Sequence, residues 1–284
     1  MSTHDYILTL SCPDTTGIVH RVSGVLFELG CNILDAQQFG DSGSGRFFLR
    51  VHFSAPEGVE AATLRQRFGE LAQGFAMQWQ IHDASARARL MLMVSKQGHC
   101  LNDLLFRVSS GQLKADVVAI VSNHPDYATL AASYGVPFHH LPVTSDTKAE
   151  QERRVLKLVD ELNVDLVVLA RYMQILSEDM CRALAGRAIN IHHSFLPSFK
   201  GARPYHQAHD RGVKLIGATA HYVTADLDEG PIIEQGIERV DHTMTANDLT
   251  EVGSDIESRV LARAVRSHVE QRVMLNGHRT VVFH

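Results

Sequence analysis

Three polar side chains in the second half of the chain have the types and spacing that carbonyl chemistry needs. Asn190 and His192 stand two residues apart, and Asp228 lies in a short stretch that ends in Gly230 and Pro231. An amide, an imidazole and a carboxylate can together polarise a carbonyl, stabilise the oxyanion formed when it is attacked, and move a proton. This chemistry requires no cofactor, and we expect none.

Each of these residues also has a purely structural interpretation. An isolated Asn-x-His more often caps a loop or packs as a core histidine with a backbone partner. The stretch from Asp228 to Pro231 by itself predicts a turn. The catalytic hypothesis therefore depends on the elements that would bring the three side chains together.

The second part of the chain predicts an open α/β sheet. Residues 90–94, 117–122 and 166–170 are apolar runs separated by helical patterns, which is typical of buried parallel strands. A doubly wound, mostly parallel sheet follows, with its ligand cleft beyond the carboxyl ends of the strands. Residues 171–176 and the Asn190 segment should both emerge there. Residues 248–275 predict a helix, and 280–283 a last strand or extended tail.

The front of the chain predicts a smaller unit. Strands are expected at residues 6–10, 32–39, 46–53 and 77–82, and helices at 18–29 and 60–74. The order βαββαβ predicts a ferredoxin-like layer of helices on an antiparallel sheet. Asp14 is expected to cap the first helix, with Gly17 as a turn residue. A polar linker at residues 83–89 separates a domain at 1–84 from a second at 85–284.

The composition is that of a soluble globular enzyme, with 45% hydrophobic residues, 21% charged residues and a formal net charge of -5. No run of Lys or Arg is present, so neither nucleic acid nor a membrane is expected as a partner, and small molecules are favoured. The start of the chain lacks the pattern of a secretory signal, which predicts a cytoplasmic protein. The cysteines are scattered and are interpreted as free thiols, namely Cys12, Cys31, Cys100 and Cys181.

The 17 histidines raise the question of a metal site. The chain has no His-Glu-x-x-His and no Cys-x-x-Cys, and its paired histidines fall in different predicted elements. The sequence therefore predicts no metal site.

Longer stretches around the three polar residues resemble a known family. Asn190, His192, Gly201 and the Asp228 segment resemble the formyltransferase fold family, and the runs at 193–197, 204–208, 217–222 and 230–235 resemble its formyltetrahydrofolate deformylase branch. The front unit, through residues 14–19 and 30–33, is similar to an ACT domain. The resemblance covers nearly the whole chain. It implies a hydrolase that converts 10-formyltetrahydrofolate to tetrahydrofolate and formate.

The resemblance also implies roles for individual residues. Asn190 and His192 would donate hydrogen bonds to the formyl oxygen, while Asp228 would orient His192 and take a proton from the attacking water. Either His192 or Asp228 acting through water would then protonate the leaving nitrogen. The residues implied to bind the folate are Tyr172, Met173, Gln174, Ile175, Leu176, His193 and Gly98.

Two departures bear on the acceptor. In the glycinamide ribonucleotide enzymes a Gly-Ser-Asn loop holds the acceptor's phosphate, whereas this chain has Gly98-His99-Cys100 at that place. Gln174 stands where amine-acceptor transferases often carry Arg. The altered loop favours water as the acceptor. The alternatives are a folate-dependent formyltransferase to an amine such as glycinamide ribonucleotide, and a non-catalytic metabolite sensor.

The ACT resemblance implies regulation by amino acids, with glycine and methionine as effectors. An effector carboxylate would bind at the Gly17 end of the helix, and its amine near Asp14 or Asn32 of a paired subunit. A structural role for these three residues, as cap, turn and loop, is equally open. A one-sided sheet of this size seldom stays uncovered, so we expect a homo-oligomer formed through the front unit.

Overall fold

The computed structural model describes residues 3–194 and 204–284. Two compact units are present: Met1–Ala86 with Glu270–Asn276 and Val281–His284, and Arg87–Val269 with Gly277–Thr280. The last residues of the chain thus group with the first unit, whereas the sequence placed all of 85–284 in the second domain. Part of the family resemblance lies outside the described residues, namely Phe195, Leu196, Pro197 and Gly201.

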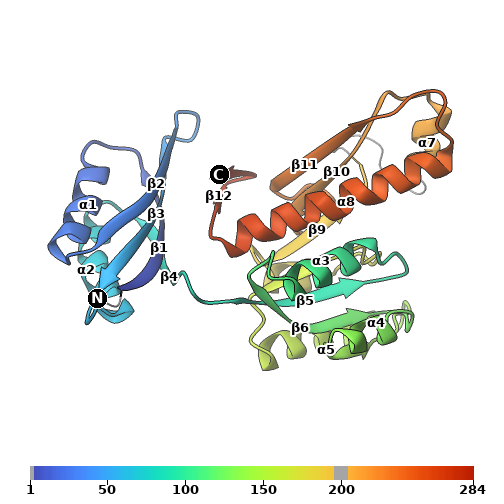
Figure 1. The fold of residues 1–284 in the computed structure, drawn as a ribbon, viewed down its shortest axis with the longest axis horizontal. Coiled ribbons are helices and arrows are strands. Elements are labelled where there is room, and N and C mark those ends of the chain that lie inside the picture. The colour runs from blue at the N-terminus through green and yellow to red at the C-terminus, as the bar shows by residue number, and fades with distance from the viewer. Residues whose placement is uncertain (1–2, 195–203) are drawn as a thin grey trace. The chain divides into compact units, whose positions relative to one another are not determined.

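The first unit has the predicted βαββαβ order. Its elements are β1 (Thr3–Pro13), α1 (Ile18–Glu28), β2 (Asn32–Asp41), β3 (Arg46–Pro56), α2 (Ala61–Gly74) and β4 (Gln78–Asp83). The strands form an antiparallel sheet in the order β2-β3-β1-β4, and both helices cover one face of it (Figure 1). Helix α1 buries Ile18, Val22 and Leu26, which recur every four residues and therefore share one face. The ferredoxin-like prediction is confirmed.

The start of helix α1 differs from the prediction. Its N-cap residue is Gly17, with φ 90°, and the described part of the chain supplies no side-chain cap hydrogen bond to the first turn. Asp14 is exposed, and its backbone N–H donates to Gly45 O at 2.9 Å. The expected capping role of Asp14 is wrong, because the chain enters the helix through a left-handed glycine that places Asp14 too far upstream.

The second unit contains a seven-stranded sheet and its covering helices. The strands are β5 (Ala88–Val94), β6 (Ala115–Ser122), β7 (Phe138–His140), β8 (Leu166–Leu169), β9 (Ala188–His192), β10 (Leu215–Tyr222) and β11 (Ile232–Arg239). Helices are α3 (His99–Ser109), α4 (Ala128–Ser133), α5 (Lys148–Glu161), α6 (Glu178–Ala183), α7 (Pro204–Asp210) and α8 (Ala246–Val269). The sheet order is β11-β10-β9-β8-β5-β6-β7.

Strands β5 to β9 run parallel, and β10 and β11 are antiparallel additions at one edge. Helices α3 and α8 lie on one face of the sheet and α5 on the other (Figure 1). The mostly parallel, doubly wound prediction is confirmed. Because β8 and β9 are parallel neighbours, the segments that follow them leave the sheet at the same edge, as the sequence predicted.

The end of the chain is only partly helical. Helix α8 stops at Val269, and Gln271 has φ 55°, so the predicted helix over 248–275 is wrong beyond residue 269. The chain then forms a hairpin of β12 (Val273–Asn276) and β13 (Arg279–Val282), which confirms the predicted last strand. Arg50 of β3 is 8% exposed and donates from Nε to Gln271 O and from Nη2 to Glu270 O, both at 3.1 Å. These bonds hold the chain at the point where the helix ends.

We expect Arg50→Met to destabilise the first unit by about 1–3 kcal/mol, because two backbone carbonyls lose a charged donor. Trp79 is the single tryptophan and packs against the core of this unit, so its fluorescence in urea follows the unfolding of this unit. Arg65→Met is the matched control, since Arg65 is exposed on α2. Coincident unfolding curves for Arg50→Met and the wild type would show that the bonds from Arg50 to the two carbonyls do not stabilise this unit.

Candidate active site

Strand β9 carries two of the three predicted catalytic residues on one face. Asn190 and His192 are two residues apart, so the pleat points both side chains the same way. In the antiparallel pairing with β10, Asn190 lies opposite His221 and His192 lies opposite Thr219. The register of this strand pair therefore adds His221 to the site.

Asp228 reaches the same place from the loop between β10 and β11. Its backbone φ is 58°, a left-handed conformation that is uncommon for a residue with a side chain. The loop closes where the Tyr222 N–H donates to Pro231 O at 2.9 Å. A Cβ atom on Gly230 would lie 1.7 Å from Tyr222 O, so only glycine lets the backbone pass there. This close approach fixes the position of the loop.

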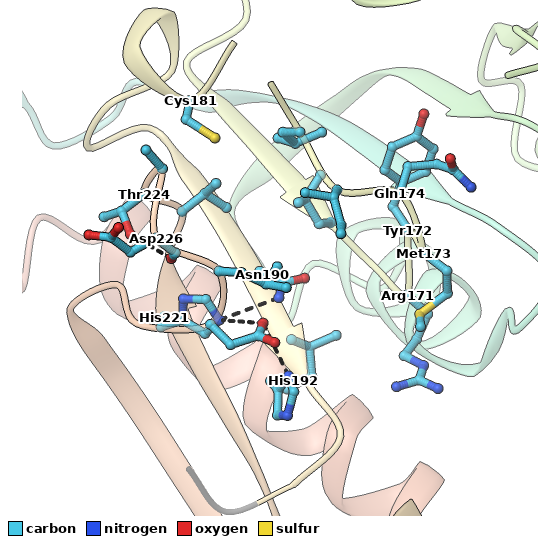
Figure 2. A pocket seen from close by; sticks show the side chains of 18 of the residues that line it. Arg171, Tyr172, Met173, Gln174, Cys181, Asn190, His192, His221, Thr224 and Asp226 are labelled. Carbon is cyan, nitrogen blue, oxygen red and sulfur yellow. Dashed lines mark hydrogen bonds and ion pairs between the residues drawn. The ribbon is translucent and has the colours of Figure 1, made fainter. Parts of the chain in front are cut away.

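The four polar side chains form one connected group (Figure 2). His192 Nδ1 lies 3.1 Å from Asp228 Oδ1, and His221 Nε2 lies 3.8 Å from the same oxygen. Asn190 Nδ2 is 3.3 Å from His221 Nε2. The arrangement brings together all three residues that the sequence singled out. The sequence indicated His221 only as part of a run that resembles the family. Its position opposite Asn190 on the neighbouring strand brings it into the site.

The tautomer of His221 follows from its second contact. His221 Nδ1 lies 2.9 Å from Tyr222 O, and because a carbonyl can only accept, Nδ1 carries the proton. In the neutral ring Nε2 is then an acceptor, and it takes a hydrogen bond from the Asn190 amide. His221 thereby fixes which way the Asn190 amide points.

Charge at the site is concentrated on Asp228. Burial acts to raise the pKa of Asp228, but the hydrogen bond from His192, together with the nearby ring of His221, outweighs it and holds that pKa well below its usual value. His192 is 5% exposed, and its Nε2 atom is buried with no hydrogen-bond partner among the described residues. A buried nitrogen in this condition indicates a place for a ligand oxygen.

A cavity of about 260 Å³ lies beside this group. The predicted residues that line it are Asn190, His192, Asp228, Tyr172, Met173, Gln174, Ile175, Leu176 and His193. Met173 and Ile175 are 57% and 62% exposed, so one wall of the cavity is apolar and open to solvent. The predicted carboxyl-end cleft therefore contains both the polar group and an apolar wall.

The segment that forms the apolar wall is anchored by Ser95 at the end of β5. The Ser95 N–H donates to Arg171 O at 3.1 Å, and the Met173 N–H donates to Ser95 Oγ at 3.0 Å. The Tyr172 hydroxyl accepts from Gln151 Nε2 at 2.9 Å, and burial raises the pKa of Tyr172 to about 12. The Tyr172 hydroxyl is thus committed to the core.

Gly98 does not line the cavity. It is the N-cap residue of α3, and a Cβ atom there would lie 2.4 Å from the ring of Tyr127. The Tyr127 hydroxyl donates to Lys96 O at 2.7 Å and so holds the ring over the glycine. The structure gives Gly98 a packing role.

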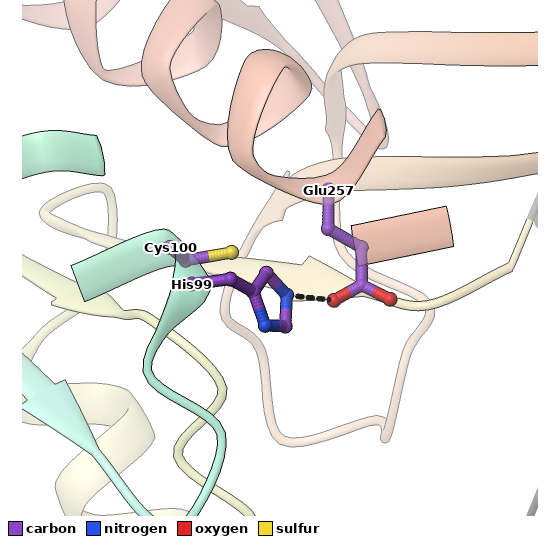
Figure 3. Close-up of side chains that lie close together, drawn as sticks. All are labelled: His99, Cys100 and Glu257. Carbon is purple, nitrogen blue, oxygen red and sulfur yellow. Dashed lines mark hydrogen bonds and ion pairs between the residues drawn. The ribbon is translucent and has the colours of Figure 1, made fainter. Parts of the chain in front are cut away.

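His99 follows Gly98 in the chain, and its ring faces the buried carboxylate of Glu257 (Figure 3). Glu257 of α8 is 1% exposed; His99 Nε2 donates to its Oε2 at 2.7 Å, and the Tyr205 hydroxyl donates to its Oε1 at 2.6 Å. Arg171 Nε lies 3.4 Å from Oε2. Although burial alone would raise the pKa of Glu257, the bond from His99 and the charge of Arg171 lower it.

His99, Cys100 and Glu257 have ligand atoms within 4.8 Å of one another, a spacing compatible with a metal ion. The carboxylate, however, already accepts bonds at both oxygens and lies beside a guanidinium. Burial raises the pKa of the Cys100 thiol far above its usual value, which opposes the thiolate that a metal requires. These contacts describe a hydrogen-bonded network better than a metal centre.

The three regulatory candidates lie in the first unit, at its surface. Asn32 lines a hollow of about 420 Å³ with His20 and Phe27, among others, and Phe27 is 83% exposed. Asp14 and Gly17 are exposed but do not line this hollow. The structure thus brings only Asn32 of the three to the hollow.

Comparison with known proteins agrees with this architecture. Residues 88–265 match the formyl transferase family, and residues 6–67 match the ACT domain family. Among the described residues, no helix is long and apolar enough to cross a membrane. Fold and site thus define a formyltransferase-fold chain that carries an ACT domain.

Two individual relatives identify the family within this class of proteins. The formyltetrahydrofolate deformylase of Corynebacterium sp. (strain P-1) is 52% identical over 98% of this chain and 97% of its own length. The crystal structure of formyltetrahydrofolate deformylase from Burkholderia mallei has a TM-score of 0.95 and 56% identity, covering 99% of this chain and all of that one (100%). The chain belongs to the formyltetrahydrofolate deformylase family.

A second, less similar structure matches a smaller share of the chain. Glycinamide ribonucleotide transformylase 1 from Symbiobacterium toebii matches with a TM-score of 0.66 and 31% identity, covering 70% of this chain and 95% of that one. The same scaffold thus occurs in proteins named for transfer to an acceptor.

The low pKa of Asp228 predicts a specific dependence of stability on pH. The unfolded chain takes up a proton at this carboxyl near a pKa of about 3.9, whereas the folded chain keeps it charged to lower pH. The pairing therefore contributes stability fully above about pH 4 and loses it as the pH falls through the folded pKa. We therefore expect the stability that the wild type gains over Asp228→Asn from this pairing to decrease as the pH falls from about 5 toward 2.

Urea unfolding followed by far-ultraviolet circular dichroism at a series of pH values measures this difference. Asp226→Asn is the matched control, because Asp226 is an exposed carboxyl in the same loop. A difference for Asp228→Asn that stays constant across this range would contradict the pairing.

Proposed function

We propose that this protein hydrolyses 10-formyltetrahydrofolate to tetrahydrofolate and formate. Membership of the deformylase family supports the reaction. The observation that carries the assignment of the site is the Nε2 atom of His192, which is buried without a partner among the residues that the structure describes, while the other ring nitrogen is paired with Asp228 at 3.1 Å. A nitrogen so placed can meet a formyl oxygen in the adjoining cavity.

In the proposed mechanism, Asn190 and His192 stabilise the oxyanion. The Asn190 amide keeps one N–H on His221 Nε2 and offers the other to the formyl oxygen. His192 donates from Nε2 when its ring is protonated, and the Asp228 carboxylate stabilises that charged ring. Donors fixed before the reaction need no rearrangement as charge develops, and losing one costs about 100- to 1000-fold in rate.

Asp228 is also the proposed base. Water attacks the formyl carbon and passes a proton to the carboxylate, and the bond from that carbon to the folate nitrogen then breaks. The leaving nitrogen receives a proton either from His192 or from Asp228 through water. All atoms come from the folate and water, so this scheme requires no cofactor.

The apolar wall supports folate binding. Met173, Ile175 and Leu176 line the cavity, and the exposed positions of Met173 and Ile175 offer contact area to a flat pterin ring. Backbone groups of the same segment can hydrogen-bond the ring edge, and Gln174 adds a neutral amide. A sensor without catalytic activity is disfavoured, because the relatives that match nearly the whole chain are named as deformylases.

The ACT domain supports regulation by an amino acid bound to the first unit. We propose glycine and methionine as the effectors, and a homo-oligomer formed through the edge strand β2. That strand is exposed along most of its length, with Ile33, Leu34 and Phe39 at 40%, 49% and 46% exposure. An exposed apolar edge strand favours pairing with a second copy.

The activity is tested by tetrahydrofolate release from 10-formyltetrahydrofolate in water alone. We expect release by the wild type, and a fall in kcat of about 100- to 1000-fold in Asn190→Ala while folate binding persists. Asn102→Ala is the matched control, since Asn102 is exposed on α3. Wild-type turnover in Asn190→Ala would refute the site, and release only when glycinamide ribonucleotide is added would refute the hydrolase.

The regulatory proposal is tested by calorimetry with glycine and methionine. We expect saturable binding to the wild type and weaker binding to Asn32→Ala, because Asn32 lines the hollow beside α1. Gln38→Ala, an exposed change on the same strand, should bind as the wild type does. Absence of binding by the wild type would exclude these effectors, and equal binding by both variants would exclude Asn32.

A further inference from the structure

Arg171 has a conformation and a burial that the proposed mechanism does not use. It follows the end of β8 with φ 64°, in the left-handed region that favours glycine, yet its side chain is large and the residue is 7% exposed. Such a residue persists only where its surroundings hold it in place. The contacts of the Arg171 side chain should therefore explain why the residue keeps this backbone conformation.

The Arg171 guanidinium lies between Gln97 and Glu257. Its Nε and Nη2 donate to Gln97 Oε1, the former at 2.8 Å, and Nε lies 3.4 Å from Glu257 Oε2. Nη1 is buried without a hydrogen-bond partner among the described residues. One guanidinium nitrogen thus goes unused, so full pairing alone does not explain an arginine here.

Arg171 also lines the cavity that contains Asn190 and His192. Behind its guanidinium, the Glu257 carboxylate is held by His99 and Tyr205, and a Cβ atom on Gly253 would lie 2.1 Å from the Tyr205 ring. Arg171 therefore both lines the cavity and contacts the buried carboxylate, which itself does not line the cavity.

We infer that the Arg171 side chain, held by Glu257, fills the compartment that an amine acceptor would occupy, so that water alone reaches the formyl carbon. This inference rests on the proposed hydrolysis. It identifies Arg171 as the residue that makes water the acceptor of the formyl group. A buried carboxylate is what recognises the N–H groups of a small primary amine. In this chain an internal guanidinium takes that position.

The inference predicts an altered reaction when the compartment is opened. In Arg171→Gly the backbone conformation becomes unstrained, and the vacated space joins the cavity. An amine nitrogen can then attack the formyl carbon, the bond from that carbon to the folate nitrogen breaks, and the amine's proton passes to the folate. The products are tetrahydrofolate and an N-formyl amine, and no further reactant is needed.

The experiment uses the full chain, 10-formyltetrahydrofolate and glycinamide as the amine, with N-formylglycinamide and formate quantified by mass spectrometry. We expect formate alone from the wild type, and a rise of about tenfold or more in the ratio of N-formylglycinamide to formate for Arg171→Gly. Arg171→Lys keeps the charge and most of the volume, so its product should remain formate.

Three outcomes overturn the inference: N-formylglycinamide made by the wild type, formate alone from Arg171→Gly, or an equal ratio in Arg171→Lys and Arg171→Gly. If Arg171→Gly does not fold, Arg171→Asn, whose short side chain tolerates the left-handed backbone and leaves the space open, is judged by the same product ratio. Wild-type hydrolysis without amine is measured first. Its absence would refute the proposed function, whereas intact hydrolysis with an unchanged product ratio would refute this inference alone.

Discussion

The antiparallel register between β9 and β10 is the constraint on which the candidate site depends. It sets Asn190 opposite His221, and so gives the Asn190 amide a fixed acceptor. Because side chains alternate along a strand, a shift of one residue would turn Asn190 and His192 to the opposite face. Both strands are paired on their other sides as well, β9 with β8 and β10 with β11, which secures the register.

Two residues at the cavity have left-handed backbones despite carrying side chains. Asp228 and Arg171 have φ values of 58° and 64°, and conformations of this kind cost on the order of 1–3 kcal/mol each. Local bonds hold both: Asp228 is paired with His192, and the Arg171 carbonyl accepts from the Ser95 N–H. The strain directs one carboxylate into the site and one guanidinium beneath it, which an extended backbone at these positions would not do.

Local patterns were enough to predict most of the fold, whereas the hypothesis for the three polar residues of the candidate site depended on the family resemblance. Strands and helices follow from apolar periodicity, and the carboxyl-end cleft follows from parallel strands. What the patterns missed depends on partners distant in sequence. His221 enters the site through strand register, and Glu257 meets His99 across 158 residues. The stop of α8 at Val269 coincides with bonds from Arg50, 220 residues away.

Backbone strain was equally hidden. A positive φ at Arg171 or Gln271 has no local signal, because neither residue type favours it. The residue type of Asp14 suits a helix cap, but Gly17 is the residue that stands at the N-cap of α1. Gly98 was assigned to the ligand by analogy, whereas the Tyr127 ring that covers it comes from a later loop. Residue type fixes what a side chain can do, and tertiary contacts decide whether it does so.

The residues that line the cavity differ in polarity and exposure. The side formed by Met173 and Ile175 is apolar and open, which suits a large planar ligand that must enter and leave. Arg171, which also lines the cavity, is buried and contacts Glu257, a buried carboxylate that does not line it. An enzyme whose acceptor is water needs no binding site for it, but must deny other nucleophiles a place. The buried charge of Arg171 makes the exclusion strong, because an amine that displaced the guanidinium would leave buried charges without their partners.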